Sequence, residues 1–473
     1  MKKLLTFLMS TGLIVPTVTG VVACLPATKF DPTAIGTGID TSGALDDSIS
    51  SEENEKSDFT NYYIVGDSLS DVDGIGTYMV KKLQPLLDQV IGNLTQGIPI
   101  PNLQNLKVNL KVALDGDGYG FADADDNHHS AFSNGGTAGY LLNEELGFKP
   151  MKSSNIFVTE PNDDDGEGYG NNYAVGGATA AQMDGFMGSI LNDATIEKQT
   201  VALIKQHKIS TNDLTFFEIG GNDLFAMIDN YKDTALVDRV FNEGIKSIRT
   251  GIYNLLNHGM SKILFMTPPK MNEVPKYGAF FKEDANEEQK AQAKFIEEIG
   301  EKYQKAILDI ITEVNTYYEN KVEVFDLYNE FADILDWFKN KDVDNNIIDQ
   351  GYTDESGGYY VLNDETNALL PGVAKDDFIY EKDDYKNGIV TIAEFIQKIT
   401  ELASLAGGFS KSARSYQTRA EGTQTYVQLL MLGRNTKNPT WDIKNYFFTD
   451  YVHPTAQVHE YVAKLLAKKF DLK

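Results

Sequence analysis

The residue types that could do chemistry stand in four short motifs. Ser68 lies in "GDSLS", directly after the apolar run at 62–65, where it would be either the N-cap of a helix or a nucleophile at the end of a strand. "GGATA" at 176–180 and "GGND" at 220–223 also follow apolar runs, whereas "DYVHPT" at 450–455 precedes a helical pattern. Serine, histidine, aspartate and backbone or amide N–H donors are the parts that ester cleavage by a serine nucleophile requires.

The base for such a nucleophile would be one of six histidines. His453 alone has both a carboxylate, Asp450, three residues before it and a proline directly after it, and Asp450 can orient the imidazole within one turn. The alternative for this pair is the lead-in to a helix. The other five fit capping, packing or solvated positions: His207 and His258 close predicted helices, His459 falls on the last helix, and His128 and His129 lie in an acidic loop.

Three donors are predicted for the oxyanion: the backbone N–H groups of Ser68 and Gly177 and the side-chain amide of Asn222. Gly177 lacks a Cβ, so its backbone can approach a substrate closely, although a tight turn would also explain the glycine pair. Asn222 could instead cap the helix that follows. Asp223 suits that cap better, and Asp67 is expected to cap a turn without a catalytic role.

The elements that must position these motifs are short β-rich runs alternating with amphipathic helices. Strands are predicted at 62–65, 171–175, 214–219, 262–266 and 321–326, and helices at 137–146, 195–207, about 235–258, about 286–317 and 455–470. This alternation predicts an α/β fold, a three-layer α/β/α sandwich around one mostly parallel, five-stranded sheet. Ligands bind beyond the carboxyl ends of such strands, so the four motifs should meet at one edge.

Taken together, the four motifs resemble the GDSL family of esterases and lipases, also called SGNH hydrolases. "NYAVGGAT", "EIGGND" and "FSNGGTAGYLLNEELG" at 132–147 are similar to the longer, lipase-type members, in which the last segment helps to frame the site. The resemblance covers about 61–470 apart from two excursions and implies a flavodoxin-like SGNH-hydrolase fold. It also implies acyl-ester hydrolysis by Ser68, His453 and Asp450. No G-x-S-x-G is present, so the nucleophile elbow of the α/β-hydrolases is excluded.

Two long excursions interrupt the alternation. Residues 81–135 are loop-rich, and residues 331–445 separate the last predicted strand from the C-terminal helix, with a helix near 390–406. The second excursion is predicted to be an insertion that could cap the strand ends and shape an acyl pocket. Its apolar islands at 336–338 and 367–373 would line that pocket, touch a membrane or form the insertion's own small core.

Within the first excursion, residues 115–126 nearly match a calcium-binding loop. Its positions 1, 3, 6, 9 and 12 would be Asp115, Asp117, Gly120, Asp123 and Asp126. Tyr119 breaks position 5, and the last residue is Asp where Glu is usual. A solvated acidic loop is therefore expected rather than a metal site. No cofactor is predicted, because triad chemistry needs no metal.

The N-terminus predicts export followed by lipidation. Two lysines and an apolar stretch lead to "VVAC", which resembles a bacterial lipobox with cleavage before Cys24, the only cysteine. An ordinary secretory signal is the alternative. The predicted organisation is a signal peptide at 1–23, a flexible tether at 24–58 and a hydrolase domain at 59–473. The expected location is the extracellular face of a cell membrane, with the protein held there by its lipid.

The net charge of −27 excludes one class of partner. Binding a polyphosphate would need a basic stripe, and the sequence has none, so nucleic acid is not expected. The predicted function is a surface-anchored serine hydrolase acting on acyl esters of lipids, including phospholipid or lysophospholipid. The alternatives are a carbohydrate O-acetylesterase, an acyltransferase on the same fold, and a surface binding lipoprotein without catalysis.

Overall fold

The computed structural model describes residues 31–95, 108–158, 169–341, 351–352, 354–363, 380–382, 425–435, 438–470 and 472. The chain divides into two units, residues 1–34 and residues 35–473. In the first unit, Pro32–Ala34 form a 3-10 turn, η1, and Asp31 accepts hydrogen bonds from the N–H and hydroxyl of Thr33. The predicted signal peptide and Cys24 lie outside the described residues, as does everything else before residue 31.

Four parallel strands form the central sheet of the second unit, in the order β1-β5-β6-β7. They are β1 (Asn61–Val65), β5 (Asp213–Glu218), β6 (Lys262–Met266) and β7 (Val322–Phe325). The predicted fifth strand, 171–175, instead runs parallel beside β1 and joins it through a single bridge, Ile64 to Asn172. The N–H of Gly66, which would donate to residue 173 in a regular ladder, instead donates to the side-chain oxygen of Gln199.

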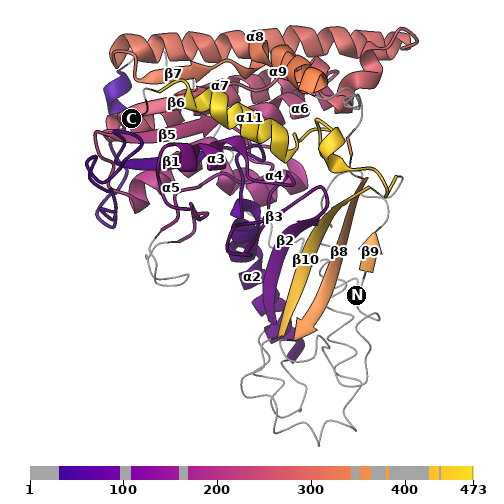
Figure 1. Cartoon of the computed structure of the whole chain (residues 1–473), viewed down its shortest axis with the longest axis horizontal. Coiled ribbons are helices and arrows are strands. Elements are labelled where there is room, and N and C mark those ends of the chain that lie inside the picture. Colours follow the sequence, from indigo (N-terminus) through magenta and orange to yellow (C-terminus); the bar gives the residue numbers. More distant parts are fainter. Residues whose placement is uncertain are drawn as a thin grey trace, which may run out of the picture. The chain divides into compact units, whose positions relative to one another are not determined.

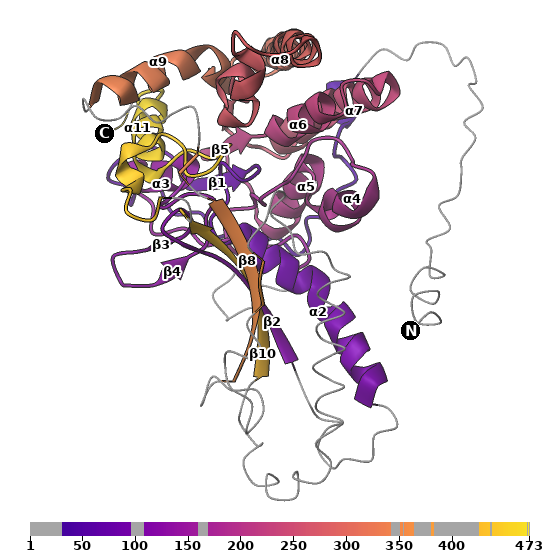
Figure 2. The ribbon, with the colours of Figure 1, turned by 90° about the vertical axis from the view of Figure 1, so that its right-hand side faces the viewer.

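Helices cover both faces of this sheet, so the three-layer α/β/α sandwich is confirmed (Figure 1). Successive strand side chains point to opposite faces, and Tyr62 and Tyr63 accordingly enter different cores. The core with Tyr63 includes residues of α5 (Ile196–Gln206), α7 (Thr234–Asn257) and α8 (Glu287–Tyr317). The core with Tyr62 includes residues of α3 (Ala138–Glu145), α9 (Leu327–Lys341) and α11 (Ala456–Ala467). Figure 2 shows α3 and α11 on one side of β1 and α5 on the other.

The remaining elements are mostly short connections around the sheet. They are α2 (Gly74–Thr95), β3 (Phe121–Ala122), β4 (His128–His129), α4 (Gly185–Leu191), η3 (Asn192–Ala194), α6 (Gly221–Asp229), η4 (Met271–Glu273), η5 (Pro275–Phe281) and η8 (Ile443–Asn445). α2 is the longest of them. It runs directly from the "GDSLS" motif, and the sequence reading missed it because glycines and Pro85 interrupt its pattern.

A second sheet joins the two excursions, which the sequence reading treated separately. Its order is β2-β10-β8-β9, with β2 at Val108–Gly116, β10 at Thr425–Arg434, β8 at Asp354–Asn363 and β9 at Tyr380–Lys382. β2 and β10 are parallel, whereas β10, β8 and β9 pair antiparallel. Residues 81–135 therefore contain the end of α2 and a nine-residue strand, not mainly loops.

The apolar island at 336–338 belongs to the hydrolase core, contrary to all three predicted roles. It lies on α9, where Phe338 is fully buried. Trp337 stacks on Tyr461 of α11 with ring centroids 3.7 Å apart. The island at 367–373 and the predicted helix near 390–406 lie outside the described residues.

Residues 35–58 are not the flexible tether predicted from their polar composition. Leu45 forms a parallel bridge with His207, and the Asp47 carboxylate lies 2.9 Å from His207 Nδ1. The Asn54 side chain is buried and donates to the Ser57 hydroxyl and the Phe59 carbonyl. Hydrogen bonds hold much of this segment against the domain, and Ile35 and Ile39 are its residues packed against the core, which is too short an apolar signal to reveal it from the sequence.

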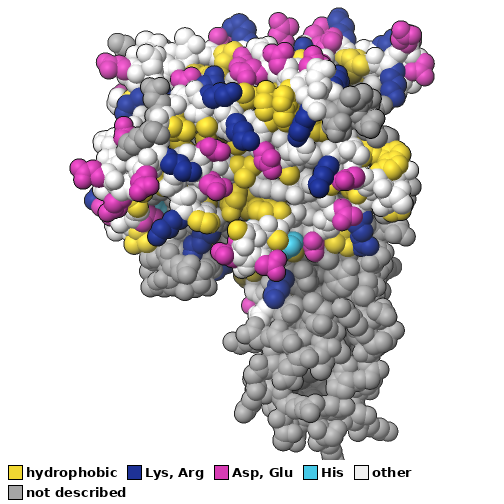
Figure 3. Space-filling model, in the orientation of Figure 1, with side chains coloured by type: hydrophobic (Ala, Val, Ile, Leu, Met, Phe, Trp, Pro, Cys, Tyr) yellow, Lys and Arg dark blue, Asp and Glu magenta, His cyan; other side chains and the backbone are white. Residues whose placement is uncertain are grey.

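Acidic and basic side chains are interspersed over the face drawn in Figure 3, and neither kind gathers into a stripe there. None of the helices in the described ranges has the length and apolar character that a membrane crossing requires.

Candidate active site

Three side chains form a hydrogen-bonded series at the carboxyl edge of the central sheet. Ser68 follows β1, and Asp450 and His453 lie in the loop before α11. Ser68 Oγ lies 2.7 Å from His453 Nε2, and His453 Nδ1 lies 2.6 Å from Asp450 Oδ2. The sheet thus brings together residues that are 385 positions apart in the chain. In this arrangement the imidazole can take the serine proton at one nitrogen while the carboxylate holds the other.

Asp450 is buried and accepts several hydrogen bonds at once. Its Oδ1 accepts the backbone N–H groups of Val452 and His453, each at 2.6 Å, and its Oδ2 also accepts the hydroxyl of Tyr119 at 2.6 Å. Burial alone would raise the pKa of Asp450, but the charge of His453 and these hydrogen bonds outweigh it and lower the pKa below its ordinary value. Asp450 is therefore ionised at neutral pH.

Two aromatic residues contact the His453–Asp450 pair, which is called the base side of the site below. The sequence had predicted a role for neither of them. Tyr119 was read only as a break in a calcium loop, whereas its hydroxyl reaches Asp450. Phe132 stacks on the His453 ring with centroids 5.0 Å apart. Phe132 begins the segment 132–147, which the resemblance had placed beside the site. No local signal marks Tyr119, because its partner lies 331 residues away.

The acidic segment 115–126 makes bonds within its own loop and to nearby histidines. Asp123 accepts the backbone N–H groups of Asp125 and Asn127, and Asp115 lies 3.3 Å from His128. Across the ranges that the structure describes, no three His, Cys, Asp or Glu side chains are grouped so as to hold a metal ion.

The predicted oxyanion donors lie around the other side of Ser68. Gly177 has φ of +79°, a conformation that favours glycine, and a Cβ there would come within 2.9 Å of Leu191. Among the described residues, no acceptor lies within hydrogen-bonding distance of the N–H of Ser68 or of Gly177. The Asn222 amide donates to Ala178 O at 2.9 Å and, more weakly, to Asp67 Oδ2 at 3.3 Å. The longer bond is the one that an oxyanion would replace.

Two buried carboxylates hold the loop that carries Gly177. Asp71 accepts the N–H of Gly176 at 2.5 Å, and Asp223 accepts those of Ala180 and Ala181 at 2.9 and 2.8 Å. The prediction that Asp223 caps its own helix is wrong, because the carboxylate turns away to this loop. Burial raises the pKa of Asp71 and of Asp223 to about 7, against the lowering effect of the backbone N–H groups.

A second pair of carboxyl groups lies directly beneath the nucleophile. Asp67 caps its turn by accepting the N–H of Leu69, as expected, and Glu218 at the end of β5 accepts the hydroxyl of Ser70 at 3.1 Å. Burial raises the pKa of Asp67 to about 6. Burial and the neighbouring Asp67 raise the pKa of Glu218 well above its ordinary value. Burial and this pairing therefore favour the neutral form of Glu218 over that of Asp67.

The structural positions predicted for His207, His258 and His459 are confirmed, whereas His129, expected in a solvated loop, is partly buried and paired with Asp73. His207 and His258 stand at the C-caps of α5 and α7, and His258 Nδ1 lies 2.8 Å from the carbonyl of Asn254. His459 Nδ1 accepts the N–H of Ala138, and burial lowers its pKa to about 3, so it stays neutral. His129 Nδ1 lies 2.7 Å from Asp73.

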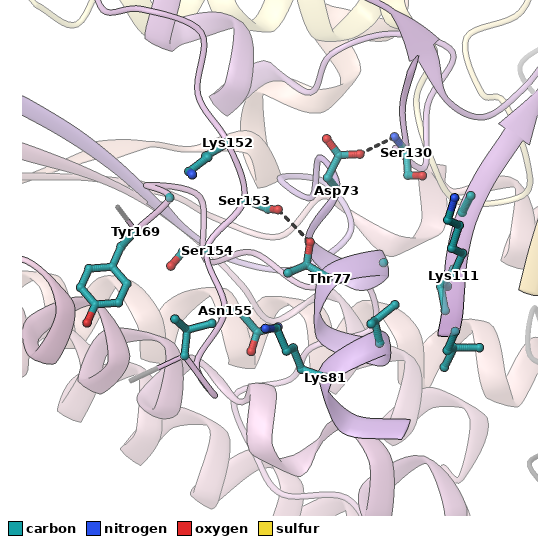
Figure 4. A pocket seen from close by; sticks show the side chains of 17 residues that line it. Asp73, Thr77, Lys81, Lys111, Ser130, Lys152, Ser153, Ser154, Asn155 and Tyr169 are labelled. Atoms are coloured by element: carbon teal, nitrogen blue, oxygen red, sulfur yellow. Dashed lines mark hydrogen bonds between the residues drawn. The ribbon is translucent and has the colours of Figure 1, made fainter. Parts of the chain in front are cut away.

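A cavity in the described part of the chain opens on Ser68. It is small, about 40 Å³, and mostly apolar. A larger cavity, of about 480 Å³, is lined by residues of α2, β2 and 152–155, with Thr77 and Ser153 bonded across it (Figure 4). None of Ser68, Asp450 and His453 lines the larger cavity.

The parallel sheet, its flanking helices and the motifs at its carboxyl edge define the SGNH-hydrolase fold. The family of GDSL-like lipases and acylhydrolases matches residues 62–466, which is most of the chain. The chain belongs to this family and is a carboxylic ester hydrolase. No curated protein sequence matches it significantly.

Proposed function

We propose that the protein cleaves acyl esters with Ser68 as nucleophile, His453 as general base and acid, and Asp450 as the group that orients His453. The observation that carries this proposal is the unbroken hydrogen-bonded series from Ser68 Oγ through the imidazole to the buried Asp450. The ionised state of Asp450 supports it, because only a carboxylate can stabilise the imidazolium that forms.

The reaction would proceed in two halves. Ser68 Oγ attacks the ester carbonyl as its proton moves to His453 Nε2, and the resulting imidazolium gives that proton to the departing alcohol, leaving an acyl-enzyme. Water then attacks the acyl-enzyme by the same steps and releases the acid. The N–H groups of Ser68 and Gly177 and the amide of Asn222 would bind the oxyanion in both halves.

The proposed location is the outer face of a cell membrane, with a lipid on Cys24. The supporting observation is the lipobox-like "VVAC" with the chain's only cysteine at the position that would be modified. Acyl lipids would then be substrates within reach. Mass spectrometry of the N-terminal peptide from cells should find a diacylglyceryl cysteine, and a Cys24→Ser variant should be released from membranes. An unmodified Cys24 in the native protein contradicts this location.

The test of the triad is labelling by a fluorophosphonate, which reacts only with an activated serine. We expect the wild-type protein to be labelled at Ser68 and to hydrolyse esters, and the Ser68→Ala variant to lose both. Ser70→Ala is the matched control, since Ser70 lies in the same motif but bonds to Glu218. If the folded wild-type protein is not labelled, the alternative of a binding lipoprotein on an inactive scaffold replaces the enzyme.

A further inference from the structure

The small cavity beside Ser68 limits what can be attached to that serine. It measures about 40 Å³ and lies beyond the carboxyl ends of all four sheet strands. A water-sized group needs on the order of 10–15 Å³ by this measure, so the cavity holds roughly three atoms or groups of that size. A long acyl chain does not fit there without displacing the walls.

The walls are apolar and firmly packed on the inner side. Met271 and Val274 follow β6, and Leu327 and Phe331 belong to α9; all four are buried. Phe331 packs edge-on against Phe447 with ring centroids 5.8 Å apart, within the core that also holds α11. Enlarging the cavity on this side would therefore require the hydrophobic core to rearrange, which is costly.

The outer wall is made by a more exposed ring. Phe225 lies one turn after Asn222 on α6, so both side chains lie on the same face of that helix. Lys276 Nζ lies 4.6 Å from the centre of the Phe225 ring, and Tyr277 packs beside it at 6.0 Å. Unlike Phe331, Phe225 is only partly buried, so it can change with less damage to the fold than the buried wall residues.

The chemistry of the reaction assigns this cavity to the acyl half of the substrate. The acyl group stays bonded to Ser68 Oγ while the alcohol leaves and water enters, so the alcohol needs an open path and the acyl group does not. A polar alcohol would also find few partners in this cavity, since Asp67, Ser68 and Asn222 are the polar side chains among its described lining.

We propose that this cavity is the acyl pocket, that it takes short acyl groups of about two to four carbons, and that Phe225 sets the limit. This inference rests on the proposed function and narrows it. The substrates would be acetyl to butanoyl esters rather than long-chain lipids.

The experiment is a chain-length series on the full-length protein with p-nitrophenyl acetate, butanoate, hexanoate and octanoate. We expect kcat/KM of the wild-type protein to fall at least about 10⁴-fold from butanoate to octanoate, because each of the four added methylenes that does not fit costs roughly 10-fold or more. Phe225→Ala should recover at least about 10-fold of that loss, and Phe225→Leu less. If the Phe225→Ala variant folds poorly, the Phe225→Leu variant tests the same prediction.

Phe241→Ala is the matched control. Phe241 is likewise partly buried, lies 4.3 Å from Lys302 Nζ and packs beside Tyr303 at 5.7 Å, but it does not line the cavity. Its chain-length profile should equal that of the wild type. A wild-type profile that stays level or rises to octanoate overturns the inference and leaves the proposed function standing, as does a profile that neither Phe225 variant changes. Absence of hydrolysis with every ester contradicts the proposed function itself.

Discussion

The two sides of Ser68 use carboxylates in opposite ways. On the base side, Asp450 faces an imidazole, and its pKa is lowered although it is buried. On the oxyanion side, Asp71, Asp223 and Glu218 are equally buried, but their pKa values are raised, and they face backbone N–H groups or another carboxyl. Burial is common to both sides, so the neighbouring charge decides which carboxylate stays ionised.

This difference follows from what each side must do in the reaction. The base side has to stabilise a positive charge on His453, so an ionised carboxylate is useful there. The oxyanion side has to receive negative charge, so full negative charges nearby would oppose the reaction. The raised pKa of Glu218 favours its neutral form and so reduces that charge, and Asp71 and Asp223 act only through the loop that they hold.

The largest effect is expected from Asp450→Asn, which should lower kcat by about 10⁴ while the fold survives. An amide at this position cannot stabilise the imidazolium and favours the wrong tautomer of His453. Asp442→Asn is the control, because Asp442 lies in the same loop region and caps only η8. Loss of less than about tenfold, measured by ester hydrolysis, would remove Asp450 from the triad.

Asn222→Ala should lower kcat by about 10²–10³ by removing one oxyanion donor. Asn230→Ala is the control on the same residue type, since Asn230 follows α6 and bonds to Ala226 O at the exposed end of that helix. Because Asn222 is proposed to bind the oxyanion and not the ground-state ester, KM of the Asn222→Ala variant should stay within a few-fold of the wild-type value. If only KM changes, Asn222 binds substrate and the hole consists of backbone donors alone.

Asp223→Ala should act on stability first, because it leaves the N–H groups of Ala180 and Ala181 buried without an acceptor. We expect a loss of roughly 2–3 kcal/mol in the free energy of unfolding. Asp238→Ala, at an exposed position, should change it by less than about 0.5 kcal/mol. Denaturant unfolding measures both, and equal values for the two variants would mean that Asp223 does not hold the loop.

Tyr119→Phe should lower kcat by about tenfold, since one hydrogen bond to a charged group is worth about 1.5–3 kcal/mol and the other bonds to Asp450 remain. The acid limb of the pH–rate profile should shift as well, because Asp450 loses a donor that keeps its pKa low. Tyr352→Phe, whose hydroxyl bonds to a backbone carbonyl, should change neither. If the pH profile of the Tyr119→Phe variant is unaltered, the role of Tyr119 is packing and not hydrogen bonding to Asp450.

The smallest effect, when it is measured over one pH unit, is on the pH dependence of stability. The pKa of Asp223 is about 7 in the folded protein against 3.8 for the free side chain, so the folded state binds more protons between these values. Stability is therefore greatest below about pH 4 for this group and falls by about 1 kcal/mol per pH unit as pH rises to 7. In Asp223→Asn, which does not titrate, thermal unfolding at several pH values should show a smaller decrease. A steeper decrease would contradict the raised pKa.

Much of the central fold was predictable because its signals are local. Hydrophobic periodicity and caps within a few residues predict strands β1, β5, β6 and β7 and helices such as α7 and α8. The segment 171–175 shows where local signals stop being sufficient: its composition is that of a strand, but the distant Gln199 side chain accepts the N–H of Gly66 that would extend its ladder with β1. The second sheet was missed because β2 and β10 are separated by more than half of the chain.

The sequence by itself determined which residues are proposed to carry the chemistry, because a serine after a strand, a donor amide and an Asp–His pair spaced three apart are recognisable locally. Only the tertiary structure decided their surroundings. Tyr119 reaches Asp450 across 331 residues, Asp223 turns from its helix to another loop, and Phe225 closes the cavity beside Ser68. These contacts, the pKa values that burial sets and the volume of a cavity depend on which distant segments pack together, and no local pattern of residues encodes that.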